Sequence, residues 1–147
     1  MPLVAACKIM SLSYRESKEI SKEQLFTLYN SVGWSAYTNN MDQLANAIKG
    51  SSYVCAVWDK DILVALVRCI SDDASIMYLQ DVLVQPQYQQ QGIGRVLVQK
   101  TLDRYSHVRQ KLLLTDNRPE QLRFYASMGY KNTNEYDTLN AFVRFDA

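Results

Sequence analysis

Residues 89–95, QQQGIGR, lie between an apolar run with strand character and an apolar run with helical periodicity. A helix N-terminus leaves main-chain N–H groups without intrahelical partners and carries a partial positive charge. Glycine permits a positive φ there and lets an anion come close to the main chain. The pattern therefore predicts a loop that binds a phosphate or a pyrophosphate, in which Gly92 and Gly94 act through backbone geometry.

Two common anion-binding loops fit these residues poorly. A P-loop needs Lys and then Ser or Thr after its last glycine, whereas Gly94 is followed by Arg95-Val96. A dinucleotide-binding fingerprint needs Gly or Ala where Leu97 stands, and a tight turn where seven residues separate Val84 from Gly92. We expect instead a wider loop whose main-chain N–H groups come from residues around the glycines, namely Gln89, Gln91, Ile93 and Arg95.

The elements that position this loop follow from hydrophobic periodicity. Strands are expected at residues 9–14, 52–58, 62–70, 76–84, 111–115 and 141–145. Helices are expected at residues 22–32, 42–49, 94–107 and 119–128. Ser21 is the predicted N-cap of the first helix, and Gly33 and Gly129 end the first and the last. A meander of strands followed by βαβα predicts an α/β fold with a mixed sheet flanked by helices.

Two segments resemble signatures of the GNAT acetyltransferase superfamily. Residues 82–94, VLVQPQYQQQGIG, resemble its acyl-CoA signature, whose core of Gln or Arg, x, x, Gly, x, Gly or Ala is met by Gln89, Gly92 and Gly94. Residues 122–130, LRFYASMGY, resemble a second signature, in which a Phe-Tyr or Leu-Tyr pair precedes Gly-Phe or Gly-Tyr. The resemblance implies a mostly antiparallel mixed sheet of six to seven strands with about four helices, splayed between strands 4 and 5, with acetyl-CoA in the gap.

The resemblance also implies roles for residues that would contact acetyl-CoA. The main chain of Leu83 and Val84 would bind the acetyl carbonyl and the pantetheine amides as a neighbouring strand would. Arg95 either adds positive charge near the phosphates or lies on a solvated helix face. Tyr125 would place its phenol near the thioester sulfur. Because a phenol of pKa about 10 is a weaker acid than a thiol of about 8.5, either the site lowers that pKa or Tyr125 mainly hydrogen-bonds the departing sulfur.

The acceptor side of the predicted site rests on three further residues. Asp81 interrupts an apolar strand face, where burial would raise the pKa of a carboxyl group and suit it to act as a general base. The alternatives are a carboxylate held by a loop N–H or a basic side chain, and an amine that loses its proton through water. Trp34 and Tyr37, in the loop that the resemblance places over the acceptor, are expected to line the pocket or to pack in the core.

Composition limits the classes of function. A chain of 147 residues with 48% hydrophobic residues suits one domain over residues 1–147, and a formal charge of +1 predicts no nucleic-acid or membrane partner. The cysteines Cys7, Cys55 and Cys69 form no CxxC pair, and His107 stands apart from them, so we expect reduced thiols, no metal and a cytoplasmic protein.

These observations predict an N-acetyltransferase that moves an acetyl group from acetyl-CoA to a primary amine by direct attack in a ternary complex. A non-catalytic acyl-CoA-binding sensor or assembly module would need the same phosphate loop, and is the alternative. Transfer to a protein N-terminus or lysine is a third hypothesis. The acceptor stays open among a metabolite, an antibiotic and a protein, and so does the formation of a homodimer.

Overall fold

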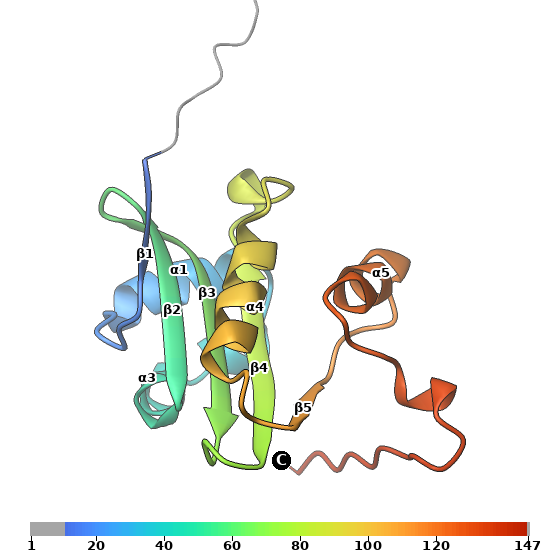
Figure 1. Cartoon of the computed structure of the whole chain (residues 1–147). Coiled ribbons are helices and arrows are strands. Elements are labelled where there is room, and N and C mark those ends of the chain that lie inside the picture. Colours follow the sequence, from blue (N-terminus) through green and yellow to red (C-terminus); the bar gives the residue numbers. More distant parts are fainter. Residues whose placement is uncertain (1–10, 147) are drawn as a thin grey trace, which may run out of the picture. The chain divides into compact units, whose positions relative to one another are not determined.

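The computed structural model describes residues 11–146 (Figure 1), and the chain divides into two compact units between Leu113 and Leu114. The first unit contains one sheet. Its strands are β1 (Leu12–Arg15), β2 (Tyr53–Asp59), β3 (Ile62–Ser71), β4 (Ile76–Val84) and β5 (Gln110–Leu113). They lie in the order β1-β2-β3-β4-β5. The mixed α/β sheet predicted from the sequence is confirmed, with five strands in the described part of the chain.

The pairing follows the predicted meander and crossover. β1, β2, β3 and β4 pair antiparallel with their neighbours, and β5 returns parallel to β4 after a helix. In the β3–β4 pair, Arg68 lies opposite Asp81 and Cys69 opposite Leu79, so Gln80 is an extra residue on β4. A β-bulge of this kind re-aims side chains on the strand that carries it.

The helices begin and end close to the predicted positions. They are α1 (Lys22–Ser31), α2 (Ser35–Thr38), α3 (Met41–Gly50), α4 (Ile93–Arg104) and α5 (Pro119–Ser127), with short 3-10 turns at Pro86–Tyr88 and Thr133–Glu135. Ser21 caps α1 as predicted, since its Oγ accepts from the Gln24 N–H at 3.2 Å. The single turn of α2 lies where the sequence predicted a loop.

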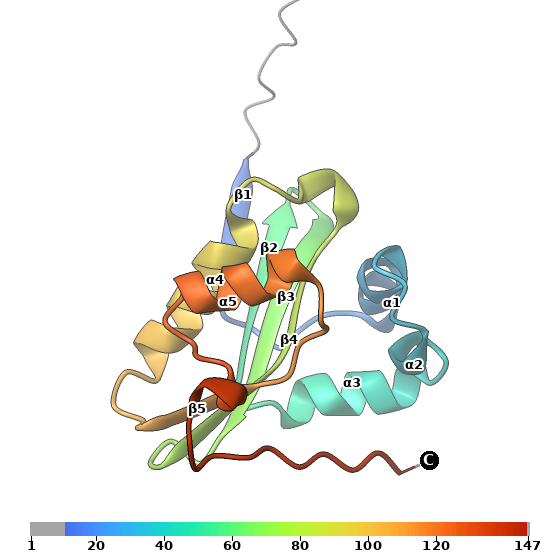
Figure 2. The same cartoon turned by 90° about the vertical axis from the view of Figure 1, so that its right-hand side faces the viewer.

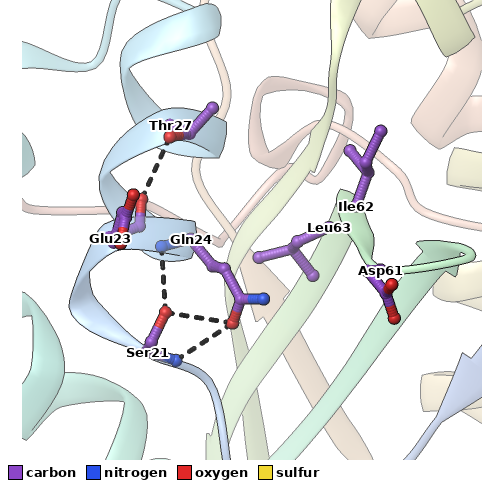
Figure 3. A pocket seen from close by; sticks show the side chains of 7 residues that line it. All are labelled: Ser21, Glu23, Gln24, Thr27, Asp61, Ile62 and Leu63. Carbon is purple, nitrogen blue, oxygen red and sulfur yellow. Dashed lines mark hydrogen bonds between the residues drawn. The ribbon is translucent and has the colours of Figure 1, made fainter.

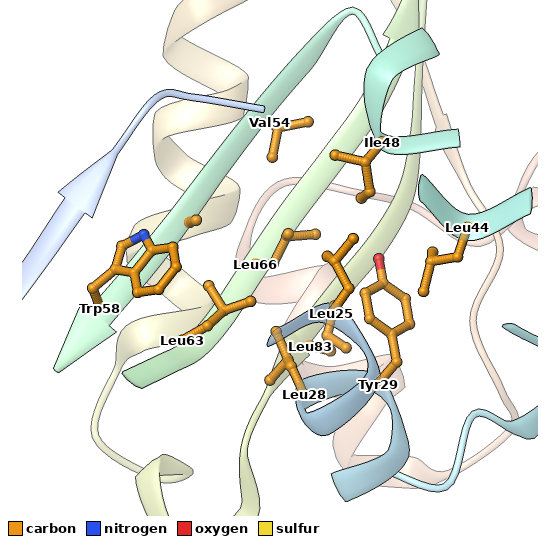
Figure 4. Close-up of a cluster of buried hydrophobic side chains, with 11 residues drawn as sticks. Leu25, Leu28, Tyr29, Leu44, Ile48, Val54, Trp58, Leu63, Leu66 and Leu83 are labelled. Carbon is orange, nitrogen blue, oxygen red and sulfur yellow. The ribbon is translucent and has the colours of Figure 1, made fainter. Parts of the chain in front are cut away.

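Helices cover both faces of the sheet in the first unit (Figure 2). α1 and α3 lie on one face and bury Leu25, Leu28 and Tyr29 against strand residues such as Leu66 and Leu83 (Figure 4). On the other face, α4 packs on β3 and β4 through four buried side chains, Ile93, Leu97, Val98 and Thr101. These two layers fix the orientation of β4, which is the strand that leads into the predicted phosphate loop.

β4 and β5 separate partway along β4. Their pairing runs from Ile76 opposite Gln110 to Leu79 opposite Leu113, and β4 then continues through residues 80–84. Within the described strands, this last part of β4 is paired on its β3 side alone. The pairing stops where β5 itself ends, one residue before the bulge residue Gln80. The predicted splay between strands 4 and 5 stays a prediction.

The second unit holds α5 and the 3-10 turn at Thr133–Glu135. The strand predicted at residues 141–145 is wrong: no strand is assigned after β5 within residues 114–146. Alternating apolar residues favour a strand, but a strand also needs a partner for its main-chain groups, and none pairs with this segment. The first predicted strand, residues 9–14, begins outside the described residues.

Candidate functional site

Gly92 begins α4 in the conformation that the loop hypothesis requires. Its φ of 80° is left-handed, which an L side chain adopts at a cost, and it occupies the N-cap of α4. Apart from Gly92 itself and its two chain neighbours, no heavy atom of the described residues lies within 4 Å of the position that a Cβ would take there. The first-turn N–H groups that follow, starting with Ile93 and Gly94, have no partner inside the helix by geometry. This start of α4 provides both the open space and the partial positive charge that an anion needs.

The turn before Gly92 is held in shape by side chains that reach neighbouring strands. The Tyr88 hydroxyl donates to Asp59 Oδ2 at 2.6 Å, and the Gln89 Nε2 donates to the Val84 carbonyl at 2.9 Å. The main-chain N–H of Gln89 donates to the Pro86 carbonyl at 3.3 Å. Gln89 was expected to offer that N–H to a phosphate, but the N–H serves the turn instead, so Gln89 shapes the loop.

Two residues of β4 point main-chain groups to the open side. In an antiparallel pair, successive residues direct their N–H and C=O groups alternately toward and away from the partner strand. Because the Gln85 N–H donates to the Val64 carbonyl at 2.8 Å, Leu83 also faces β3, whereas Val82 and Val84 face away from it. The prediction for Val84 fits this geometry. The prediction for Leu83 is corrected to Val82, since the alternation depends on register, which the sequence does not specify.

Asp81 is buried in a polar cluster and not among apolar side chains. Its side chain is 2% exposed and pairs with Arg68, whose Nε lies 2.5 Å from Oδ2. The Tyr29 hydroxyl donates to Oδ2 at 2.9 Å, and the Tyr37 hydroxyl donates to Oδ1 at 2.8 Å. The apolar surroundings expected for this carboxyl group are therefore not what the structure contains. The alternative of a carboxylate held by a basic side chain describes what the structure contains.

Tyr37 links the α2 turn to β4 through its hydroxyl group. The oxygen that donates to Asp81 also accepts from Gln80 Nε2 at 2.9 Å and from an Arg68 guanidinium nitrogen at 3.3 Å. Burial, and then the charge of Asp81, raise the pKa of Tyr37, so it is a neutral hydrogen-bonding group. Trp34 lies next to it, with ring centroids 6.1 Å apart. Tyr37 therefore reaches the bulge of β4, and Trp34 lies beside Tyr37. Both rings pack against the hydrophobic core, which was the alternative, and their contact with an acceptor stays a prediction.

Sequence reasoning missed three members of this cluster. Tyr29 lies in the apolar stripe of α1, which predicts a core residue. Its ring is in the core, and its hydroxyl donates to Asp81. Arg68 is the lone charged residue within the apolar strand 62–70, and a buried charge of that kind requires a partner. That requirement was a usable signal. Gln80 gave no signal, because its orientation depends on the bulge.

Tyr125 lies on α5 in the second unit. Burial and then the charge of Asp116 raise its pKa to about 12. Its ring meets those of Phe124 and Tyr130, with centroids 5.0 and 6.0 Å away. Of the two chemical options for this phenol, the raised pKa favours hydrogen bonding to a leaving sulfur over complete transfer of the proton.

Other features of the described residues lie apart from these groups. An open hollow of about 290 Å³ lies between the start of α1 and the β2–β3 turn (Figure 3), and the predicted site residues do not line it. Within residues 11–146, no cluster of His, Cys, Asp or Glu has an arrangement suited to a metal ion. Over the same residues, no helix is long and apolar enough to cross a membrane.

A mixed sheet that opens along its fourth strand, followed by a helix with a glycine cap, is the architecture of an α/β acyltransferase. The chain belongs to the GNAT acetyltransferase family, since the family's model, described as an acetyltransferase (GNAT) domain, matches residues 16–145. The match spans both compact units. Members of this family use acetyl-CoA.

Relatives of known sequence and structure agree with this assignment. A Gibberella zeae protein named as an acetyltransferase is 28% identical over 115 residues, which are 76% of this chain and 62% of the relative, so the chain spans less than two thirds of that relative. A GNAT family acetyltransferase from Streptococcus pneumoniae shares 27% identity with a TM-score of 0.79, over 92% of this chain and 98% of that one. The PaiA N-acetyltransferase from Thermoplasma acidophilum, solved with coenzyme A, has a TM-score of 0.70 at 17% identity, over 83% and 91% of the two chains, and shows the fold alone.

Proposed function

We propose that this protein transfers an acetyl group from acetyl-CoA to a primary amine by direct attack in a ternary complex. The observation that carries the proposal is the geometry after Leu79. The open edge of β4 leads, through a braced turn, to a helix that begins at a left-handed glycine with free space above its Cα. Acetyl-CoA has an extended arm with amide groups, followed by a diphosphate. The open strand edge suits the arm, and the start of the helix suits the diphosphate.

Residues of this chain fit the parts of acetyl-CoA. The main-chain N–H groups at Gly92, Ile93 and Gly94 would hold the diphosphate, with those of Gln91 and Arg95 beside them. The outward main-chain groups of Val82 and the outward N–H of Val84 would pair with the pantetheine amides and the acetyl oxygen, as an added strand would. The Val84 carbonyl already accepts from Gln89 Nε2. An N–H aimed at that oxygen stabilises the negative charge that develops on it. Acetyl-CoA supplies an acyl group activated as a thioester.

The chemical step needs little from the protein beyond placement and hydrogen bonds. The lone pair of the neutral amine nitrogen forms the new C–N bond, and the C–S bond breaks with its electron pair on sulfur. Tyr125 would donate a hydrogen bond to that sulfur, in keeping with its raised pKa. Asp81 already accepts three hydrogen bonds in a buried setting, so we assign it to hold Tyr37 and Arg68 in place. The amine then loses its proton to water.

Two measurements on the full chain test the proposal. Calorimetry with acetyl-CoA should show binding at one site per chain, and thiol release should become dependent on an added amine. Tyr125→Phe should retain binding and release thiol more slowly. Binding without release for any amine would overturn the transfer reaction and favour a non-catalytic acyl-CoA-binding module. Absence of binding by a folded protein would overturn both functions.

A further inference from the structure

The two segments that meet beside the open part of β4 carry almost no charge. Residues 26–41, which include the α1–α2 turn, have no Asp, Glu, Lys, Arg or His, and residues 74–94 have Asp81 alone. These segments meet where Tyr37 hydrogen-bonds both Gln80 and Asp81. Gln80 is also the residue at which β4 leaves β5. The phosphate loop lies past the other end of this open edge, so the Gln80 end is where an acyl group and its acceptor would meet.

The one carboxylate of these segments is not available to a cationic substrate. Asp81 is 2% exposed, and Arg68 neutralises its charge at 2.5 Å. Its two oxygens already accept hydrogen bonds from Tyr29, Tyr37 and Arg68. A substrate with several ammonium groups is recognised by a surface whose potential is negative, which requires unpaired carboxylates. The first unit offers no such carboxylate on these two segments.

At the Gln80 end of the edge, these segments expose a neutral amide side chain beside the Tyr37 ring. The single hydroxyl proton of Tyr37 goes to Asp81 Oδ1, so this hydroxyl can only accept from Gln80. That requirement turns Nε2 of Gln80 toward Tyr37 and leaves its Oε1 outward. Gln80 is exposed, and among the described residues no donor is bonded to Oε1. The Tyr37 hydroxyl contacts Gln80, and the Trp34 ring lies beside that of Tyr37. Both rings are only partly buried.

We infer that the acceptor is a monoamine whose remaining part is apolar or aromatic, and that Gln80 is the residue that selects it. This inference rests on the proposed function. Gln80 Oε1 accepts an N–H of the amine, and Trp34 and Tyr37 contact its apolar part. A neutral amide oxygen suits the uncharged amine that attacks, whereas a carboxylate would hold the ammonium form. Polyamines and aminoglycosides are disfavoured, because their additional ammonium groups would find no unpaired carboxylate on these two segments.

The test compares 2-phenylethylamine with spermidine and kanamycin, using thiol release from acetyl-CoA by the full chain. We expect kcat/KM to be about tenfold or more higher for 2-phenylethylamine. Gln80→Met, which keeps volume but removes the amide, should raise the KM for 2-phenylethylamine. Gln80→Glu should shift the ratio of kcat/KM values about tenfold toward spermidine. Gln110→Glu, which adds the same charge at the exposed start of β5, is the control and should leave the ratio unchanged.

Calorimetry of each amine with the protein saturated with coenzyme A distinguishes the proposed acceptor class from the proposed transfer reaction. Selective binding of 2-phenylethylamine that Gln80→Met weakens, with no turnover, would support the acceptor class and refute the transfer reaction. Turnover that favours spermidine or kanamycin would refute the acceptor class and leave the transfer reaction standing. A preference for 2-phenylethylamine that neither Gln80 variant alters, in variants with wild-type stability, would refute the role of Gln80.

Discussion

Replacing Gly92 by Ala tests the phosphate loop, because the structure separates the cost to folding from the cost to binding. Gly92 has φ 80° and nothing within 4 Å of its Cβ position, so the added methyl group meets no protein atom. The folding cost is then the left-handed backbone alone, about 1–2 kcal/mol. A domain with an ordinary stability of about 5–15 kcal/mol stays folded after such a loss.

The cost to binding is of a different origin. The methyl group would enter the space assigned to the diphosphate and push it away from the N–H groups of α4. A hydrogen bond to a charged group contributes about 1.5–3 kcal/mol, so the loss of one such bond raises the Kd for coenzyme A about tenfold to a hundredfold. Gly92→Val should weaken binding further, since it adds more atoms to the same space.

Gly33→Ala is a matched control for this experiment. Gly33 has φ 76° and also nothing within 4 Å of its Cβ position, so the two variants should lose nearly equal stability in urea unfolding. Calorimetry with coenzyme A should then show weaker binding for Gly92→Ala alone. Equal affinities in the two variants and the wild type would refute the assignment of the loop, and so would equal losses of affinity.

Four further outcomes follow from the site. Arg68→Met should lower the free energy of unfolding by about 3–5 kcal/mol, because it leaves the Asp81 charge buried and unpaired. The double variant Arg68→Met/Asp81→Leu should lose less stability than this single variant. Additive losses of stability in urea unfolding would contradict a coupled pair. Asp81→Asn should lower stability and leave the acidic limb of the pH dependence of kcat/KM in place, whereas loss of that limb would restore Asp81 as the general base. Tyr125→Phe should lower kcat about tenfold to a hundredfold, the loss of one hydrogen bond to a charged sulfur. Because the pKa of Tyr125 is about 12, its phenol stays protonated as pH rises through 10. The decrease in kcat caused by Tyr125→Phe should therefore be constant between pH 7 and 10. A decline of wild-type activity near pH 10 that the variant lacks would contradict the hydrogen-bonding role. Tyr88→Phe removes the bond to Asp59 that braces the turn before Gly92, and should weaken coenzyme A binding severalfold without the steric effect of the Gly92 variants, as calorimetry would show.

Local signals in the sequence were sufficient for most elements and for the loop. The spacing of apolar residues predicted α1, α4, α5 and the meander of β2, β3 and β4 within a few residues, because each periodicity reflects one buried face. Ser21 was identified as a helix cap and Gly92 as a loop residue suited to a positive φ, both for reasons internal to a few residues. The predicted start of the helix at residue 94 lies one residue after the observed start of α4 at Ile93. Because these signals lie within a few neighbouring residues, an anion-binding loop at the N-terminus of α4 could be predicted before the fold was known.

The relations between strands were decided only by the tertiary structure. The ion pair of Arg68 and Asp81 depends on the register of β3 with β4, and the outward position of Gln80 depends on a bulge in that pair. The register also decides that Val82, and not Leu83, directs its main-chain groups away from β3. The sequence alone therefore determined where the glycine-containing turn lies and, within one residue, where its helix begins. Pairing between strands decided which side chains and main-chain groups surround the acceptor, since hydrogen bonds between distant segments have no signature within either segment.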